Sequence, residues 1–413
     1  MRQWRLLLLV CVTFASLTSE PVPAAAYEAP MDKAAKEVLP SQLAAGADYS
    51  VKDPVVADGY MYRFTVASAY GPYDVTGLGA LRKLQREIWA IGELRKITGS
   101  EAFLSALKDQ AGKPIVFVKD VVTKPVDTLA GIPKGVGRLF SNISTAVSTT
   151  PKPSQESRTK EALQVGAFKR EYAARFGVDP YSSNQALQGE LDKLGKAAAM
   201  GLWTASIGTM PISGTAGTVI SATSLSKSFN NILQNEPPAR IRTINEEKLA
   251  KMGVDASLAQ EFLDQPVYTP RQTLILVDSL YRLGSATGRN EYLKASMAAA
   301  DEVEANFFVN MAQILRGYHE TQAPIRGLTM FGMLTVAQTR ATAVIPFSLD
   351  YGVWTANADR LSQSIKTSYR VPGSNGTFEF WVTGTLSPTA KRELEGRGFR
   401  VMEQVGGMLD VID

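Results

Sequence analysis

Residues Ala197–Ser226 read AAAMGLWTASIGTMPISGTAGTVISATSLS, and none of them is Asp, Glu, Lys, Arg or His. Charged sequence of helical character precedes this stretch, and Lys227 follows it. A charge-free stretch of this length is either the buried centre of a helical domain or a segment that enters a membrane. The choice between the two decides the fold class of the chain.

The composition of the stretch favours a buried centre. A membrane-spanning helix needs about 20 predominantly apolar residues, whereas this stretch holds ten Ser or Thr, four Gly and one Pro among thirty residues. Leu187, Leu191 and Leu194 continue one apolar face into it from upstream, and Met210–Gly214 interrupts the helical pattern. We therefore expect an αα-hairpin at the centre of a helical domain, with its second helix reaching about Leu233.

The surrounding region, residues 158–326, is also predicted to be helical. Capping residues and apolar periodicity mark the expected helices, which cover 161–176, 246–252 after Asn245, 256–263 after Asp255, 271–283 after Thr269-Pro270, and Glu291–Tyr318. The last of these is the longest, and its apolar stripe is expected to pack against the central hairpin.

In the region before residue 143, the spacing of apolar residues changes from that of a strand to that of a helix. Residues 27–58 have no sustained pattern and are expected to form an extended arm. In the α/β region 59–143, Tyr62, Phe64 and Val66 alternate with other residues as in a β-hairpin, and a helical pattern follows up to Gly99. Residues 144–157 are rich in Ser, Thr and Pro, which is typical of a linker.

Residues 327–413 are predicted to form a C-terminal α/β unit. Strand-like and helical segments alternate there in the order β-α-β-α-β, over 342–353, 356–365, 377–383, 388–395 and 399–405. The predicted fold class is therefore mainly α with smaller α/β parts.

The first 26 residues have the features of a secretory signal peptide. Arg2 and Arg5 precede the short apolar segment Leu6–Leu17, and Ala24-Ala25-Ala26 offers a cleavage site before Tyr27. We expect an exported protein, periplasmic or secreted after cleavage near Ala26. Its mature chain would contain no cysteine, since the single cysteine is Cys11.

Charge and ligand composition argue against several function classes. The chain has 44 Lys or Arg and 40 Asp or Glu, a net charge of +4, which is too balanced for a nucleic-acid-binding protein. It has one histidine and one cysteine, and it lacks phosphate-binding glycine loops. We therefore expect no metal and no cofactor.

The residues that could carry catalysis are few. His319 and Glu320 are adjacent near the end of the longest predicted helix, where a histidine also interacts favourably with the helix dipole. Asp301 and Glu304 lie early in that helix, either as paired carboxylates or as part of a solvated face. Asp350 stands near Trp354 at a predicted strand end, where the two could line a ligand pocket or simply pack.

The segment 121–143 mixes apolar and basic residues. A cationic amphipathic segment can lie on an anionic membrane surface, or it can cover the protein's own sheet with its cations in water. The candidate membrane-surface residues are Lys124, Lys134, Arg138, Leu139 and Phe140.

No reaction signature is present, so the sequence favours a non-enzymatic role. We expect an exported cell-envelope binding or structural protein that is peripheral to a membrane, with an anionic membrane surface or another envelope protein as its partner. One alternative is a carboxylate-based hydrolase acting on cell-wall glycan. Another is a scaffold subunit of an envelope complex.

Overall fold

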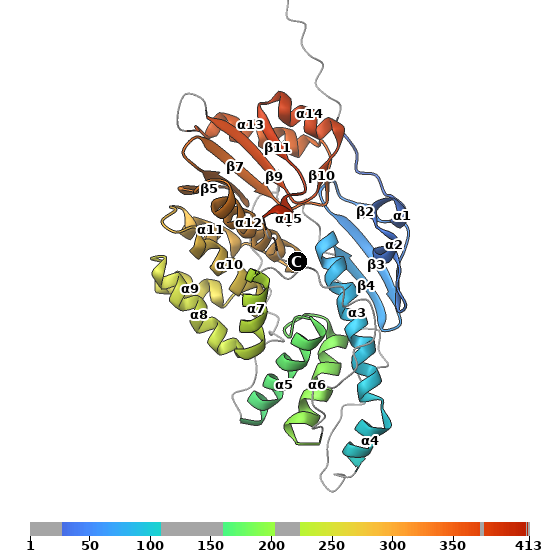
Figure 1. Cartoon of the computed structure of the whole chain (residues 1–413). Helices are drawn as coiled ribbons and strands as arrows, with labels where there is room; N and C mark the ends of the chain where they lie inside the picture. Colours follow the sequence, from blue (N-terminus) through green and yellow to red (C-terminus); the bar gives the residue numbers. More distant parts are fainter. Residues whose placement is uncertain (1–26, 109–159, 203–223, 372–375, 410, 412–413) are drawn as a thin grey trace, which may run out of the picture.

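The computed structural model describes residues 27–108, 160–202, 224–371, 376–409 and 411 (Figure 1). The predicted signal peptide and linker lie outside these residues. The described chain is mainly helical and has smaller sheet-containing parts, which confirms the predicted fold class. None of its helices combines the length and the apolar character needed to cross a membrane.

The N-terminal unit is built on an antiparallel sheet. Strand β3 (Tyr62–Ser68) is its centre, and it pairs on one side with β4 (Gly71–Thr76) and on the other with β1 (Tyr49–Val51) and β2 (Val56–Ala57). Helix α3 (Leu78–Thr98) packs on this sheet with its apolar residues buried. The predicted strand alternation and the predicted helix are both present.

The predicted extended arm is shorter in the structure than in the sequence-based expectation. Residues 35–57 form the short helices α1 (Ala35–Val38) and α2 (Ser41–Ala44) together with β1 and β2. Short two- and three-residue strands carry too little period to be recognised from sequence. Residues 27–34 contain no helix, and within them only Lys33 makes an isolated β-bridge, to Val55.

A second lobe combines the end of α3 with α4 (Glu101–Lys108), α5 (Lys160–Phe176) and α6 (Gln185–Ala199). Leu187, Leu191 and Leu194 have no exposed surface, and they pack against α3 and α5. Helix α6 therefore buries the face that the sequence assigned to it.

The charge-free stretch is only partly described. Helix α6 ends at Ala199, and α7 (Ser224–Asn235) begins two residues before the stretch ends. Residues 203–223, which hold the expected break and the adjoining ends of both expected helices, lie outside the described residues. Helix α7 packs on α5 and α10.

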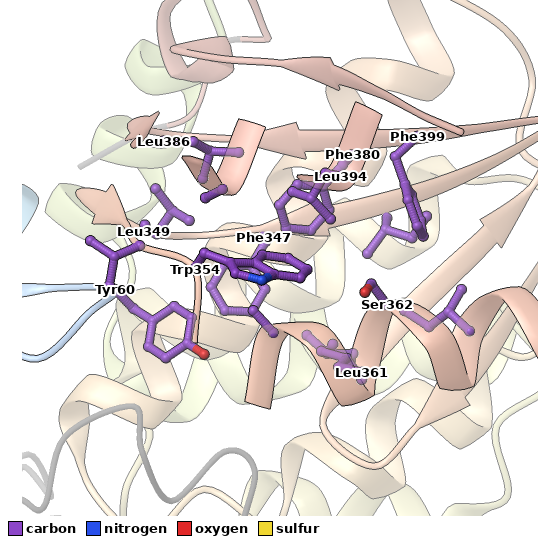
Figure 2. A pocket seen from close by; sticks show the side chains of 17 residues that line it. Tyr60, Phe347, Leu349, Trp354, Leu361, Ser362, Phe380, Leu386, Leu394 and Phe399 are labelled. Atoms are coloured by element: carbon purple, nitrogen blue, oxygen red, sulfur yellow. The ribbon is translucent and has the colours of Figure 1, made fainter. Parts of the chain in front are cut away.

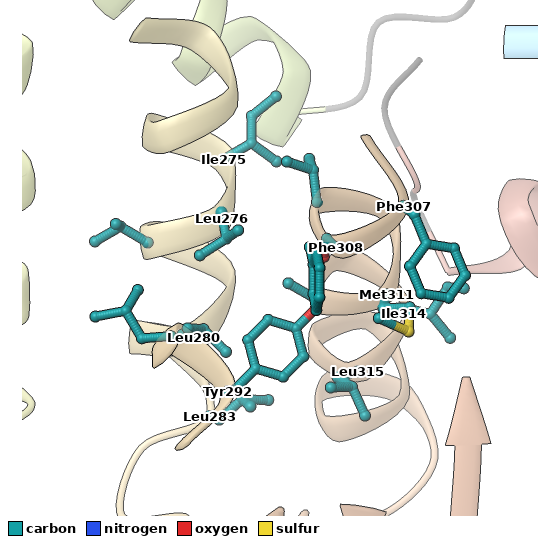
Figure 3. Close-up of a cluster of buried hydrophobic side chains, with 14 of the residues drawn as sticks. Ile275, Leu276, Leu280, Leu283, Tyr292, Phe307, Phe308, Met311, Ile314 and Leu315 are labelled. Atoms are coloured by element: carbon teal, nitrogen blue, oxygen red, sulfur yellow. The ribbon is translucent and has the colours of Figure 1, made fainter. Parts of the chain in front are cut away.

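The next five helices lie between the C-terminal sheet and the α5–α6 lobe in Figure 1. They are α8 (Pro238–Lys251), α9 (Ala256–Leu263), α10 (Pro270–Arg282), α11 (Arg289–Ser296) and α12 (Glu302–Thr321). Helix α10 has the predicted start. Thr269 is its N-cap and forms a capping box with Gln272, and Pro270 occupies the first helical position. Its apolar face packs on α12, and Tyr292 of α11 fills the space between them (Figure 3).

Two helix boundaries differ from the predictions. Helix α8 begins at Pro238, since proline is well suited to the first helical position, and Asn245 is buried inside the helix instead of capping it. The expected single helix Glu291–Tyr318 is two helices, α11 and α12. The apolar stripe continues across the break at 297–301, which hid the second helix start at Asp301.

The C-terminal unit contains the predicted β-α-β-α-β order. Three parallel strands, β7 (Thr342–Phe347), β9 (Thr377–Val382) and β11 (Phe399–Met402), alternate with α13 (Ala356–Ser368) and α14 (Pro388–Gly396).

An antiparallel hairpin that the sequence did not predict, β5 (Gly327–Phe331) and β6 (Leu334–Gln338), extends this sheet to the order β11-β9-β7-β6-β5. A smaller parallel pair, β8 (Tyr351–Gly352) and β10 (Thr385–Leu386), accompanies it, and α15 (Val405–Met408) closes the chain.

The five-stranded sheet is covered on both faces. Helices α13 and α14 lie above it in Figure 1, while α12 and α15 lie below. Ile345 and Phe378 face α13 and α14, whereas Val344 and Trp381 belong to the core shared with α12. A sheet buried on both faces needs apolar side chains in both directions, which explains the continuous apolar character of β7.

Candidate functional site

An apolar cavity of about 60 Å³ lies between helices α13 and α14 and the face of the five-stranded sheet that these helices cover (Figure 2). Strands β7 and β9 contribute Ile345, Phe347 and Phe380, and the two helices contribute Leu361 and Leu394 among others. None of the described residues that line the cavity carries a charge.

Small side chains on the two helices explain why this space stays open. Ala358 and Ser362 stand one turn apart on the cavity face of α13, and Ala390 stands on the facing side of α14. Protein interiors are normally filled to the density of organic crystals. A run of small residues opposite aromatic ones therefore leaves a gap that larger residues would close.

The hydroxyl groups at the cavity wall are already engaged. Ser362 Oγ donates to the carbonyl oxygen of Asp359 at 2.8 Å, and the hydroxyls of Tyr60 and Thr355 are 3.1 Å apart. A ligand inside the cavity would thus meet mainly carbon, and its binding would depend on the removal of apolar surface from water.

Trp354 forms one wall, and the first described residues of the chain hold it in place. The backbone N–H of Trp354 donates to the Glu28 carboxylate at 2.7 Å, and the backbone N–H of Glu28 donates to the Trp354 carbonyl oxygen at 2.7 Å. The Ser387 hydroxyl donates to the same carboxylate. We call residues 27–30 the N-terminal strap, because they tie the cavity wall to the start of α14.

An ion pair supports the same wall from outside. The Arg397 guanidinium lies 4.5 Å from the centre of the Trp354 ring, and it donates to the Asp359 carboxylate at 2.8 Å. The Tyr27 hydroxyl donates to that carboxylate as well, at 2.8 Å. Trp354 is therefore fixed by packing, by the strap and by a cation over its ring.

The predicted acid–base residues His319 and Glu320 make structural contacts. Nδ1 of His319 accepts a hydrogen bond from the Ile325 N–H at 3.0 Å, which closes the turn after α12. The Glu320 carboxylate pairs with Arg282 at 3.4 Å and with Arg316 at 3.8 Å. Both side chains therefore hold structural positions at the end of α12.

Asp301 and Glu304 together begin α12. The Asp301 carboxylate accepts from the Glu304 N–H at 2.9 Å, and the Glu304 carboxylate accepts from the Ala300 N–H at 2.8 Å. This reciprocal arrangement satisfies N–H groups at the start of a helix. It also places the pair at the opposite end of α12 from His319, about 25 Å away at 1.5 Å per residue.

Asp350 caps a helix of a different unit. Its carboxylate accepts from the Tyr62 N–H and the Leu78 N–H, both at 3.0 Å, and Leu78 is the first residue of α3. Burial raises the pKa of the Asp350 carboxyl to about 6. The two hydrogen bonds from the N–H groups lower this pKa, but burial has the larger effect. A carboxylate at a helix N-terminus also interacts favourably with the helix dipole.

The structure brings together one group of polar residues that the sequence did not single out. The buried Glu87 carboxylate of α3 accepts from the Ser182 hydroxyl at 2.6 Å and from the Asn184 amide at 3.0 Å. One turn away, the Lys83 ammonium pairs with Glu302 of α12 at 3.0 Å. The partners in each of these contacts are about a hundred or more positions apart, so no local spacing in the sequence predicts the contacts.

The remaining predicted site residues cannot be placed. Lys124, Lys134, Arg138, Leu139 and Phe140 lie outside the described residues. Across the ranges that the structure does describe, no group of three His, Cys, Asp or Glu side chains is arranged to hold a metal ion.

No family model matches the sequence, and no significant similarity to a curated protein or to a solved structure is found. Function therefore has to be inferred from the geometry of the chain itself.

Proposed function

We propose that this is an exported, non-enzymatic binding protein of the cell envelope, and that its ligand is apolar and enters the cavity between the sheet and helices α13 and α14. The observation that carries the proposal is the cavity itself. Its described lining has no charge, its wall hydroxyls are engaged, and Trp354 is held at its edge by the strap. Ligand sites in proteins are typically concave and mostly apolar.

The size of the cavity limits the ligand that it can hold without a change in structure. Its volume of about 60 Å³ is smaller than the ~150 Å³ engineered cavity that takes up benzene. A ligand of several carbon atoms therefore requires α13 and α14 to move slightly apart. Such a ligand displaces no charged side chain from the wall.

A titration with the apolar fluorophore N-phenyl-1-naphthylamine tests this proposal. The mature chain should bind the fluorophore and raise its emission. The substitutions Ala358→Leu and Ala390→Leu fill the cavity and should abolish this signal, at a stability cost of about 1–3 kcal/mol from overpacking. A melting curve for each variant would show that it is still folded.

Ala102→Leu is the matched control, since Ala102 is exposed on α4 and its replacement adds the same atoms far from the cavity. This variant should bind the fluorophore like the wild-type chain. Equal binding by the wild-type chain and by both folded cavity variants would rule the cavity out as the ligand site.

The basic segment 121–143 supports a second element of the same proposal, contact with an anionic membrane surface. Flotation of the mature chain with phosphatidylglycerol-containing vesicles should recover the protein in the lipid fraction, and replacement of Lys124, Lys134 and Arg138 by Gln should reduce that recovery. Absence of the wild-type chain from the lipid fraction would end the membrane part and leave the cavity proposal intact.

A further inference from the structure

A cation stands at one end of the apolar cavity. Lys366 lies in the last turn of α13, directly after Ile365, which lines the cavity. Its ammonium group is 4.2 Å from the centre of the Phe378 ring and 5.7 Å from the centre of the Phe399 ring. Phe399 also lines the cavity, so this ring separates the ammonium group from the apolar space.

Lys366 differs from the neighbouring cations in its partners. Arg397 pairs with Glu393 and Asp359, Lys391 with Glu403, and Arg400 with Glu379. Within the residues that the structure describes, no carboxylate lies within 4.0 Å of the Lys366 ammonium, and its recorded contacts are the two aromatic rings.

The aromatic contacts position this charge without neutralising it. The face of an aromatic ring attracts a cation through its quadrupole, and the ring carries no net charge. Lys366 is partly exposed to solvent. An anion from solution can therefore approach it without displacing a carboxylate of the protein.

We propose that the ligand is a single-chain amphiphile with a carboxylate head, whose head pairs with Lys366 while the adjoining part of its chain enters the cavity past Phe399. This inference rests on the proposed apolar binding function and adds the chemical class of the ligand. The cavity, at about 60 Å³, has room for part of one chain and not for two chains.

Titration calorimetry of the mature chain with decanoate and with decanol, both below their micelle-forming concentrations, tests the inference. The two probes share a chain length and differ in head charge. Lys366→Met should weaken decanoate binding about fivefold, the size expected for an exposed charge pair, and should leave decanol binding unchanged. Lys366→Arg keeps the charge and should retain most of the decanoate affinity.

Lys251→Met serves as the matched control, because Lys251 is an exposed lysine at the end of α8 in the helical domain. It should change neither affinity. If decanoate and decanol bind the wild-type chain and decanoate binds Lys366→Met equally well, the head-group assignment is overturned while the apolar site stands. If neither probe binds the wild-type chain, the proposed function fails and the ligand class fails with it.

Discussion

At the residue scale, Asp350 shows how a buried carboxylate can be structural. Its two N–H partners come from β3 and from the first turn of α3, so one side chain ties the C-terminal unit to both. The residue before α3, Gly77, has no side chain that could cap the helix. The cap is therefore supplied from 272 positions away in the sequence, and a carboxylate that resembled a catalytic candidate serves this role instead.

The raised pKa of Asp350 gives a signed pH dependence. Between its ordinary pKa of 3.8 and about 6, the folded chain holds a proton there that the unfolded chain has released. The free energy of unfolding contributed by this group should therefore fall as pH rises through that window, by up to about 3 kcal/mol at about 1.4 kcal/mol per pH decade.

Urea unfolding of the wild-type chain and of Asp350→Asn at pH 4.5 and pH 7 measures this effect. The non-titrating variant should gain stability relative to the wild-type chain as pH rises. A difference between the two proteins that stays constant, or that changes in the opposite direction, would show that the carboxyl does not titrate in this window.

At the element scale, local signals identified most elements correctly, but they missed the hairpin β5–β6 and the break between α11 and α12. The β-α-β-α-β order was visible because each helix there has its own cap, at Thr355 and at Ser387. Asp301 and Glu304 carried an equally good helix start, but the apolar stripe on both sides suggested one uninterrupted helix. Of the cavity, only Trp354 was singled out in advance, because small helix residues leave a gap only once α13 and α14 pack on the sheet, and a local pattern does not show that packing.

The docking of α15 on α12 depends on a glycine. A Cβ atom at Gly317 would overlap the carbonyl oxygen of Leu409, which follows α15. We expect Gly317→Ala to displace the C-terminal helix and to lower the free energy of unfolding by about 1–3 kcal/mol, as overpacking does. Chemical denaturation would measure the loss.

Gly189→Ala provides the contrast, since Gly189 lies inside α6 and a Cβ atom there meets nothing within 4 Å. This variant should gain about 0.5–1 kcal/mol through the higher helix propensity of alanine. If both glycines respond alike, the close contact between α12 and Leu409 does not exist in solution.

At the scale of the whole molecule, polar contacts hold the units together around α3. Glu87 connects α3 to the loop before α6, and Lys83 connects α3 to the start of α12. The Glu87 side chain is buried, and this burial raises the pKa of its carboxyl. Such contacts join residues about 95 to 220 positions apart, which is why the sequence predicted the units but not how they are joined.

Glu87→Ala should release the α5–α6 lobe before the rest of the molecule unfolds. The substitution leaves a buried hydroxyl and a partly buried amide without their acceptor, at a cost of about 2–4 kcal/mol. Native-state hydrogen exchange should show lost protection in α5 and α6 at low denaturant, with α10 and α12 still protected. Glu87→Gln, which retains an acceptor oxygen, should show a smaller loss, and a uniform loss across all helices would contradict the separate lobe.

The strap and the Asp350 cap have a consequence for the order in which the chain is made. A ribosome completes residues 27–98 long before it reaches residues 350–387, yet Glu28 and the first turn of α3 find their partners only there. Until residues 350–387 have been made, Glu28 and the N-terminus of α3 therefore lack the hydrogen-bond partners that they have in the folded chain. The C-terminal unit, which is synthesised last, thus supplies the contacts that complete the N-terminal unit.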